Sequence, residues 1–235
     1  VASTDPPATT VAPATTEAPA PTTTEAPVVD QWEEIVASAD CMCSDGSEFS
    51  FFVRKANPEK VMFFFQGGGA CFDANGCDPA NEQYLTTVNG PDDITLGEGV
   101  FDFDNSLNPF VDFSVVFVPY CTGDVHIGNS VHDYGVSDAG NNVVIHHNGY
   151  VNATTALATL VELFPDATEV VVTGESAGSV PTPLYAGMVH DELPDARITV
   201  IADGSGAYPD VPDINAFIGD LWGTSDARPD WPETA

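Results

Sequence analysis

Two kinds of segment alternate along this chain: short runs in which every residue is apolar, and longer stretches in which apolar residues recur at helical spacing. The run Val-Met-Phe-Phe-Phe at residues 61–65 has no polar position and is typical of a central strand buried on both faces. Strands are predicted at residues 49–54, 61–66, 114–119, 168–173 and 197–203, the last of them also buried. Asn-Pro-Glu at residues 57–59 is predicted to form the turn between the first two strands.

Two helices are predicted between these strands. Residues 151–164 place apolar side chains on one side of a helix, and a second helical repeat follows residue 180 through Leu184, Tyr185, Met188 and Val189. Buried strands that alternate with helices indicate an α/β protein with a mostly parallel sheet covered by helices on both faces.

A reactive serine is predicted directly after the strand at residues 168–173. Residues 174–178 read Gly-Glu-Ser-Ala-Gly, so a G-x-S-x-G motif joins a strand to a helix, as in the nucleophile elbow of α/β hydrolases. The turn is so tight that Gly174 and Gly178 leave no room for a Cβ, and Ser176 is held at the carboxyl edge of the sheet. The simpler alternative is a glycine-rich turn with a surface serine.

Backbone donors for an oxyanion are predicted beside this serine. Residues 66–70, Gln-Gly-Gly-Gly-Ala, follow the central strand as the glycine-rich oxyanion loop of esterases does, and Ala177 N–H comes directly after the nucleophile. The alternatives for the triple glycine are a flexible turn or a phosphate loop. Phosphate binding is disfavoured because no Gly-Lys-Ser/Thr follows.

The general base is not evident in the sequence. In this class the order is serine, acid, histidine, and only His190 follows Ser176, on a helix that leads away from the reacting edge. Asp203 ends the next strand at that edge, either as the acid or as part of a turn or pocket wall. We therefore expect the chain to carry half of an active site, with the catalytic acid and histidine beyond Ala235 and the fold incomplete at its C-terminus.

The charge and composition of the chain limit the kinds of molecule that it is expected to bind. The chain has 36 Asp and Glu against 5 Lys and Arg, a net charge of −31, which disfavours nucleic acid and anionic membranes. No apolar stretch is long enough to span a bilayer.

Residues 1–28 are rich in Thr and Pro and predict a disordered stalk that tethers the domain at residues 29–235 to a wall or surface. The alternative is an inert tail. Five cysteines without metal-site spacing favour an oxidising compartment, hence secretion, and no metal.

Six separated motifs resemble the pectin acetylesterase/Notum family of α/β hydrolases, especially its bacterial members. They stand in family order at residues 43–47, 65–72, 118–126, 147–149, 174–178 and 202–206. The resemblance implies carboxylic-ester hydrolysis without a cofactor, through an acyl-enzyme on Ser176, with oxyanion donors on Gly68, Gly69 and Ala177. It also implies the disulfides Cys71–Cys77 and Cys43–Cys121, which leave Cys41 unpaired. It places Asp124 and His126, like Ala70, near the pocket wall; the alternative for Asp124 and His126 is a structural pair with satisfied hydrogen bonds.

Two departures from the family pattern affect the expected substrate. Where the animal enzyme has bulky aromatic residues after the double glycine, this chain has Gly69 and Ala70, which weakens an analogy to a lipid pocket. The acidic surface would repel the free galacturonates of pectin. A neutral acetylated glycan or a small acyl ester is therefore the expected substrate. The alternatives are a non-catalytic surface or glycan-binding module and a peptidase or thioesterase on the same fold.

Overall fold

The computed structural model describes residues 32–90, 94, 98–205, 211–227, 229 and 231. The stalk predicted at residues 1–28 lies outside these residues. Among the described residues, none of the helices has both the length and the apolar composition that crossing a bilayer requires.

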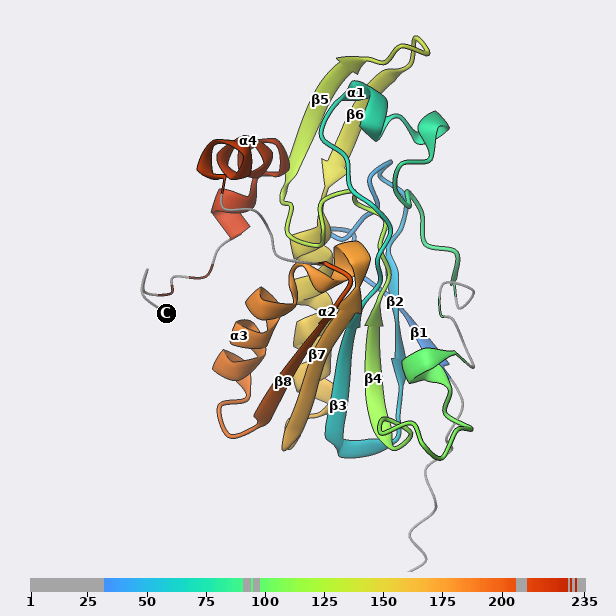
Figure 1. Cartoon of the computed structure of the whole chain (residues 1–235), viewed down its shortest axis with the longest axis vertical. Coiled ribbons are helices and arrows are strands. Elements are labelled where there is room, and N and C mark those ends of the chain that lie inside the picture. The colour runs from blue at the N-terminus through green and yellow to red at the C-terminus, as the bar shows by residue number, and fades with distance from the viewer. Residues whose placement is uncertain are drawn as a thin grey trace, which may run out of the picture.

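A six-stranded sheet forms the centre of the domain, in the order β1-β2-β4-β3-β7-β8 (Figure 1). Strands β4, β3, β7 and β8 are parallel, whereas β1 and β2 run antiparallel at one edge. This arrangement confirms the predicted mostly parallel sheet. The strands are β1 (Trp32–Val36), β2 (Ser50–Arg54), β3 (Asn57–Phe65), β4 (Phe113–Val118), β7 (Glu169–Glu175) and β8 (Arg197–Asp203).

Different elements pack on the two faces of the sheet. Helices α2 (Gly149–Leu163) and α3 (Thr182–Glu192) pack on one face, where Leu160 and Tyr185 join the apolar core formed by β3, β4 and β7. The opposite face of β3 and β4 is covered by phenylalanines of the segment that contains the 3-10 helix Gly99–Phe101. Packing on both faces explains why residues 61–65 of β3 and 115–118 of β4 are uninterrupted apolar runs.

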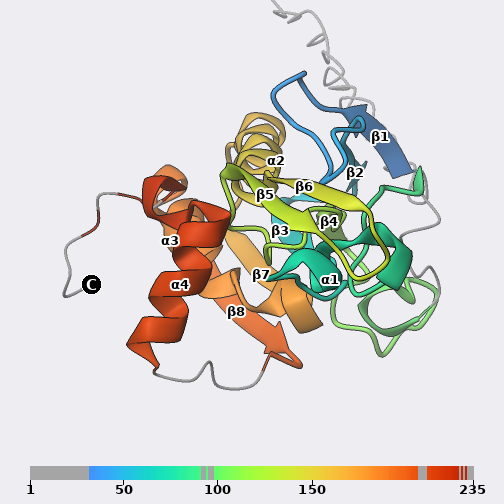
Figure 2. The same ribbon diagram turned by 90° about the horizontal axis from the view of Figure 1, so that it is seen from above.

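A second layer lies beyond the carboxyl ends of the parallel strands. It consists of the hairpin β5 (Ser130–Val136) and β6 (Asn142–His147), the short helix α1 (Ala74–Cys77) and helix α4 (Pro212–Trp222) (Figures 1 and 2). Trp222 anchors α4, because its indole N–H donates to Cys71 O at 3.0 Å and its ring stacks on Phe72. This layer and Ala177 share one apolar cluster, so it adjoins the predicted nucleophile turn.

Two details of the sequence-based prediction are wrong. Residues 57–59 are not a turn but the start of β3, and the break after β2 falls at Lys55 and Ala56. Pro58 is tolerated there because the pairing with β4 shifts register between Asn57 and Val61, where a proline removes no regular ladder bond. Strand β8 was predicted to be buried but is mostly exposed, because it is the last strand of the sheet as described.

Candidate active site

Ser176 occupies a strained turn at the carboxyl end of β7. Its φ is +48°, a left-handed conformation that costs a non-glycine residue free energy and that occurs at nucleophile elbows. A Cβ on Gly174 would lie 2.3 Å from Gly178 O, and one on Gly178 would lie 2.2 Å from Phe65 O. Both flanking positions therefore accept only glycine, for the reason inferred from the sequence, and the Ser176 residue remains exposed.

The triple-glycine corner lies against this turn. A Cβ on Gly67 would stand 3.0 Å from Ser176 Cβ and 2.6 Å from Glu175 O. Gly69 has φ +86°, and a Cβ there would meet Gln83 O at 2.2 Å. Gly67 thus packs against the serine turn, and Gly69 against Gln83, so closely that only glycine fits at either position.

Ser176 lines one open hollow of about 860 Å³ together with Gly67 and Gly68 of the glycine corner. Residues 82–87, which the sequence did not single out as functional, pack against the glycine corner and form another part of the wall of the hollow. In this segment Tyr84 is buried and donates its hydroxyl proton to Ser44 Oγ at 3.0 Å. The pair Tyr84-Leu85 in an otherwise polar stretch was the available signal for this wall. The described lining residues are Gln66, Gly67, Gly68, Pro79, Glu82, Gln83, Tyr84, Leu85, Thr86, Thr87, Asn89, Glu175 and Ser176.

A second cavity, of about 360 Å³, shares Gln66 and Glu175 with this hollow. Asp203 and Glu98 contribute carboxylates to it, while Phe64, Phe101, Phe110 and Phe117 supply aromatic walls. Asp203 is thus close to Glu175 but lines this cavity and not the hollow that contains Ser176.

Asp124 and His126 are buried beneath the glycine corner. The Asp124 carboxylate accepts hydrogen bonds from Thr122 Oγ1 at 2.6 Å, from His126 N at 3.1 Å and from Gly149 N, at the start of α2, at 2.8 Å. His126 Nε2 lies 2.9 Å from Gln66 O. Neither side chain reaches the described lining of the two cavities.

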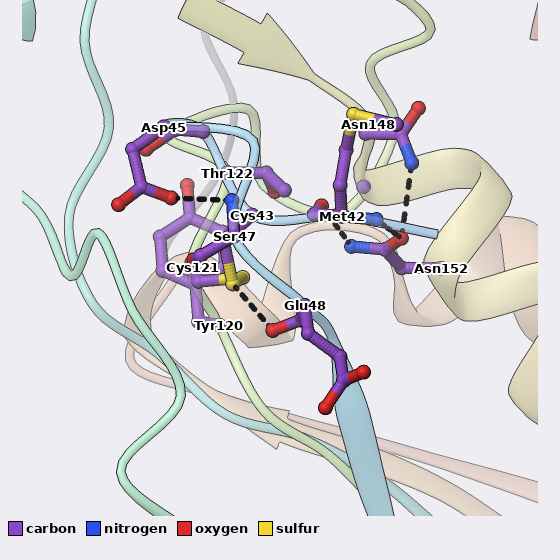
Figure 3. Close-up of a disulfide and its surroundings, with 12 residues drawn as sticks. Met42, Cys43, Asp45, Ser47, Glu48, Tyr120, Cys121, Thr122, Asn148 and Asn152 are labelled. Atoms are coloured by element: carbon purple, nitrogen blue, oxygen red, sulfur yellow. Dashed lines mark hydrogen bonds between the residues drawn. A yellow bond between two sulfur atoms is a disulfide. The ribbon is translucent and has the colours of Figure 1, made fainter. Parts of the chain in front are cut away.

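Two disulfides support this region, in the pairs that the resemblance implied. Cys71–Cys77 closes the loop that follows Ala70, and Cys43–Cys121 ties residues 41–48 to the segment after β4. Figure 3 shows that Asn152 of α2 binds the same loop, with its amide group bonded to both Met42 N and Met42 O. Cys41 is free but buried, and its thiol donates to Thr155 Oγ1 at 3.2 Å.

One cluster resembles a metal site by composition. Cys71, Cys77 and His147 bring their donor atoms within 4.8 Å of one another. The two sulfurs are joined in a disulfide, however, and both ring nitrogens of His147 have partners, Thr122 O at 3.0 Å and Tyr134 Oη at 2.9 Å. Burial lowers the pKa of His147, which keeps the ring neutral. The cluster therefore does not suit a cation.

No histidine lines either described cavity. His126 and His147 are buried in hydrogen bonds with other groups, His132 and His146 lie on the β5–β6 hairpin, and His190 is exposed near the end of α3. His190 thus lies where the sequence predicted. Among the described residues, the structure brings together the serine and the glycine corner but no imidazole base.

Known proteins resemble this chain over much of its length. A planarian (Schmidtea mediterranea) palmitoleoyl-protein carboxylesterase Notum is 24% identical over 157 residues, which cover 64% of this chain and 28% of that protein. Pectin acetylesterase 5 of Arabidopsis thaliana is 25% identical over 178 residues, covering 73% of this chain and 40% of that protein. The chain thus spans well under half the length of these two relatives.

The fold is also that of a solved structure. The crystal structure of the Wnt deacylase Notum from Drosophila superposes with a TM-score of 0.56 at 18% identity, covering 80% of this chain and 59% of that one. The sequence profile of the pectinacetylesterase family matches residues 26–219. With that match over most of its length, the chain belongs to the pectinacetylesterase family.

Proposed function

We propose that this protein is a secreted serine hydrolase of carboxylic esters, with Ser176 as its nucleophile. The observation that carries the proposal is the strained serine, φ +48°, which lies against Gly67 and shares one hollow with Gly67 and Gly68. Its family includes carboxylesterases. The two disulfides favour an oxidising compartment, and we further propose that residues 1–28 act as a spacer to a wall or surface.

The proposed reaction proceeds through an acyl-enzyme. A histidine base takes the Ser176 proton as Oγ attacks the ester carbonyl, and the N–H groups of Gly68, Gly69 and Ala177 stabilise the oxyanion. The tetrahedral intermediate then expels the alcohol, which takes the proton from the histidine, and water repeats the sequence to release the acid. Because no histidine of the chain lines the described hollow, we propose that the base and its orienting acid come from beyond Ala235.

The described hollow suits a neutral, hydroxyl-rich substrate. Its side chains include Gln83, Thr86, Thr87 and Asn89 together with the carboxylates Glu82 and Glu175, and no lysine, arginine or histidine is among the described lining residues. An anionic galacturonate would find no counter-charge there. The basic residues that the structure describes form their contacts elsewhere: Arg54, Lys55, Lys60 and Arg197. An acetylated neutral glycan or a small acyl ester fits best.

The test uses the full-length protein. Ser176→Ala should abolish acetyl-ester turnover without altering the circular dichroism spectrum, and a fluorophosphonate should label Ser176 as judged by peptide mass spectrometry. Absence of both turnover and labelling would favour a non-catalytic glycan-binding module. Labelling with peptide or thioester cleavage in place of acetyl-ester turnover would assign a peptidase or thioesterase. Unchanged turnover in Ser176→Ala would remove Ser176 from its role.

A further inference from the structure

His126 is a buried side chain that the proposed reaction does not use. It is 1% exposed, and its ring packs between Phe65, at 5.2 Å between centroids, and Tyr120, at 4.9 Å. Its Nε2 lies 2.9 Å from Gln66 O. Because a carbonyl oxygen can only accept, Nε2 must carry the proton and donate it to Gln66.

The Gln66 carbonyl belongs to the peptide group that begins the glycine corner. A trans peptide is planar, with its C=O and N–H on opposite sides, so fixing Gln66 O also fixes the direction of Gly67 N–H and the start of Gly67–Gly69. Gly67 lies against Ser176, and a Cβ built on it would stand 3.0 Å from Ser176 Cβ. The histidine bond therefore lies one peptide group from the contact between corner and nucleophile.

The backbone that carries His126 is strained. Val125 and His126 have φ values of +49° and +61°, two consecutive left-handed residues without a glycine. Each such residue costs on the order of 1–2 kcal/mol, and for a β-branched valine the conformation is rare. Strain of this kind persists where the surroundings impose it, and it is concentrated at functional sites.

Several bonds hold this strained segment in place. Val125 N donates to Tyr120 Oη at 2.9 Å, and His126 O accepts from Tyr185 Oη at 2.6 Å. His126 N donates to the Asp124 carboxylate. These contacts come from the segment after β4 and from α3 and hold the backbone of His126, while its ring is directed at Gln66 O.

The ring is also kept in the form that this bond needs. Burial lowers the pKa of His126 to about 4, against the opposing effects of the Gln66 carbonyl and the Asp124 carboxylate. The neighbouring Tyr120 and Tyr185 hydroxyls have pKa values raised by burial and stay neutral. At neutral pH the imidazole is therefore a neutral donor. It does not serve as the base for Ser176 in this arrangement, because it is buried and does not line the hollow that contains the serine.

We propose that His126 is a positioning residue for the oxyanion corner: its Nε2–H holds the Gln66 carbonyl and thereby aims the Gly67–Gly69 backbone at the reacting carbonyl oxygen. This inference depends on the proposed esterase function. It predicts that losing the donor weakens stabilisation of the transition state while leaving ground-state substrate binding intact, because the ring itself does not touch the described hollow.

The matched pair His126→Gln and His126→Met tests the donor alone. Both side chains extend four atoms from Cα, and both occupy the same strained backbone, but only Gln retains an N–H donor near the Nε2 position. In the full-length enzyme with an acetyl-ester substrate, kcat of His126→Met should fall about 100-fold with KM changed less than about twofold. His126→Gln should recover at least tenfold of that loss.

A second readout distinguishes positioning from folding. A boronic acid forms a tetrahedral adduct on an active serine, so His126→Met should weaken its affinity in parallel with kcat, while the melting temperatures of the two variants stay within a few degrees of each other. Equal kcat in the two variants, or a change in KM alone, would overturn the inference. Ser176→Ala is the control for the parent proposal: if that variant still turns over substrate, the esterase assignment fails whatever His126 does.

Discussion

The protein is tightly packed on the β3 side of strand β7 and much more exposed on its β8 side. On the β3 side, Gly174 and Gly178 pack against the backbone of Phe65 with no room for a methyl group. On the β8 side, the last strand has exposed residues along most of its length, including Val200 at 43% and Ile201 at 41% exposure. The serine stands at the boundary between these two sides.

The difference in packing means that the nucleophile turn is held in place, whereas the β8 side of the proposed site is exposed. The nucleophile turn and its glycine corner are fixed by backbone contacts within the described residues, so they need no further element to adopt their geometry. The β8 side carries Asp203 beside the aromatic cavity, and helix α4 adds exposed Ile214 and Phe217. In our proposal the acid and histidine complete the site on this less enclosed side.

The largest expected effect is a methyl group on the β3 side. Gly178→Ala would put a Cβ 2.2 Å from Phe65 O and 2.6 Å from Gln66 O, and backbone atoms cannot move away as a side chain could. We expect the free energy of unfolding to fall by more than about 3 kcal/mol, measured by urea denaturation. Gly204→Ala is the matched change on the β8 side, where the nearest atom is 3.6 Å away but φ is +82°. It should cost only the backbone strain, about 1–2 kcal/mol. Equal losses of unfolding free energy in the two variants would contradict the difference in packing between the β3 and β8 sides.

The next effect is a pH dependence that originates at His126. Its pKa is about 4 in the folded protein and 6.5 as the ordinary value, so the unfolded chain binds the extra proton between these pH values. Stability should therefore be lost as pH falls from 6.5 to 4, by about 3 kcal/mol from this residue.

Replacing His126 removes this titration and isolates its contribution. Urea denaturation of the parent and of His126→Gln at pH 7 and pH 4.5 gives the difference, and the many carboxylates titrate in both proteins alike. The variant should lose less stability on acidification than the parent. Identical pH profiles would mean that His126 does not titrate as its burial requires.

A smaller effect is expected from the strained nucleophile itself. Ser176→Gly and Ser176→Ala both remove the hydroxyl, but only glycine adopts φ +48° without a Cβ penalty. The glycine variant should be the more stable of the two by about 1 kcal/mol in thermal or urea unfolding. An alanine variant of equal or greater stability would show that the turn carries no strain.

The smallest effect is expected on the exposed face of β8. Ile201→Thr keeps a β-branched side chain in the strand, and a position 41% exposed loses little on gaining a hydroxyl. The free energy of unfolding should change by less than about 1 kcal/mol. A loss comparable with that of Gly178→Ala would mean that Ile201 packs in the interior in solution, contrary to the contrast between the two sides.

Much of the sheet and the nucleophile turn could be predicted because their signals are local. The apolar runs of β3, β4 and β7 report burial on both faces, and the glycines around Ser176 report a turn without space for side chains. Helix α2 followed from its apolar spacing. Each of these features depends on neighbours in the chain, which a single sequence displays.

Two elements with local signals were missed, and so was one feature that depends on distant partners. The hairpin of β5 and β6 was not predicted, although Asp-Ala-Gly-Asn at residues 138–141 was an available turn signal between its strands. Helix α4 was also missed, although Pro212 at its start and Gly223, with φ +66°, at its end are typical helix boundaries. The exposure of β8 could not be predicted, because an apolar strand sequence does not show whether a neighbour covers it.

The role proposed for His126 could not be predicted from the sequence either, because it depends on a contact with a residue far away in the chain. The sequence suggested a residue near the pocket wall, and only the fold shows its ring bonded to Gln66, which is 60 positions away. Nothing in the local sequence distinguishes a buried donor from a histidine at the surface.

The most direct measurement of the central claim is a crystal structure of the full-length protein after reaction with a fluorophosphonate. We predict phosphorus bonded to Ser176 Oγ, with the phosphonyl oxygen within hydrogen-bonding distance of at least two of the amides of Gly68, Gly69 and Ala177. An adduct on another residue, or a phosphonyl oxygen pointing away from the glycine corner, would contradict the assignment of this hollow as the site of ester hydrolysis.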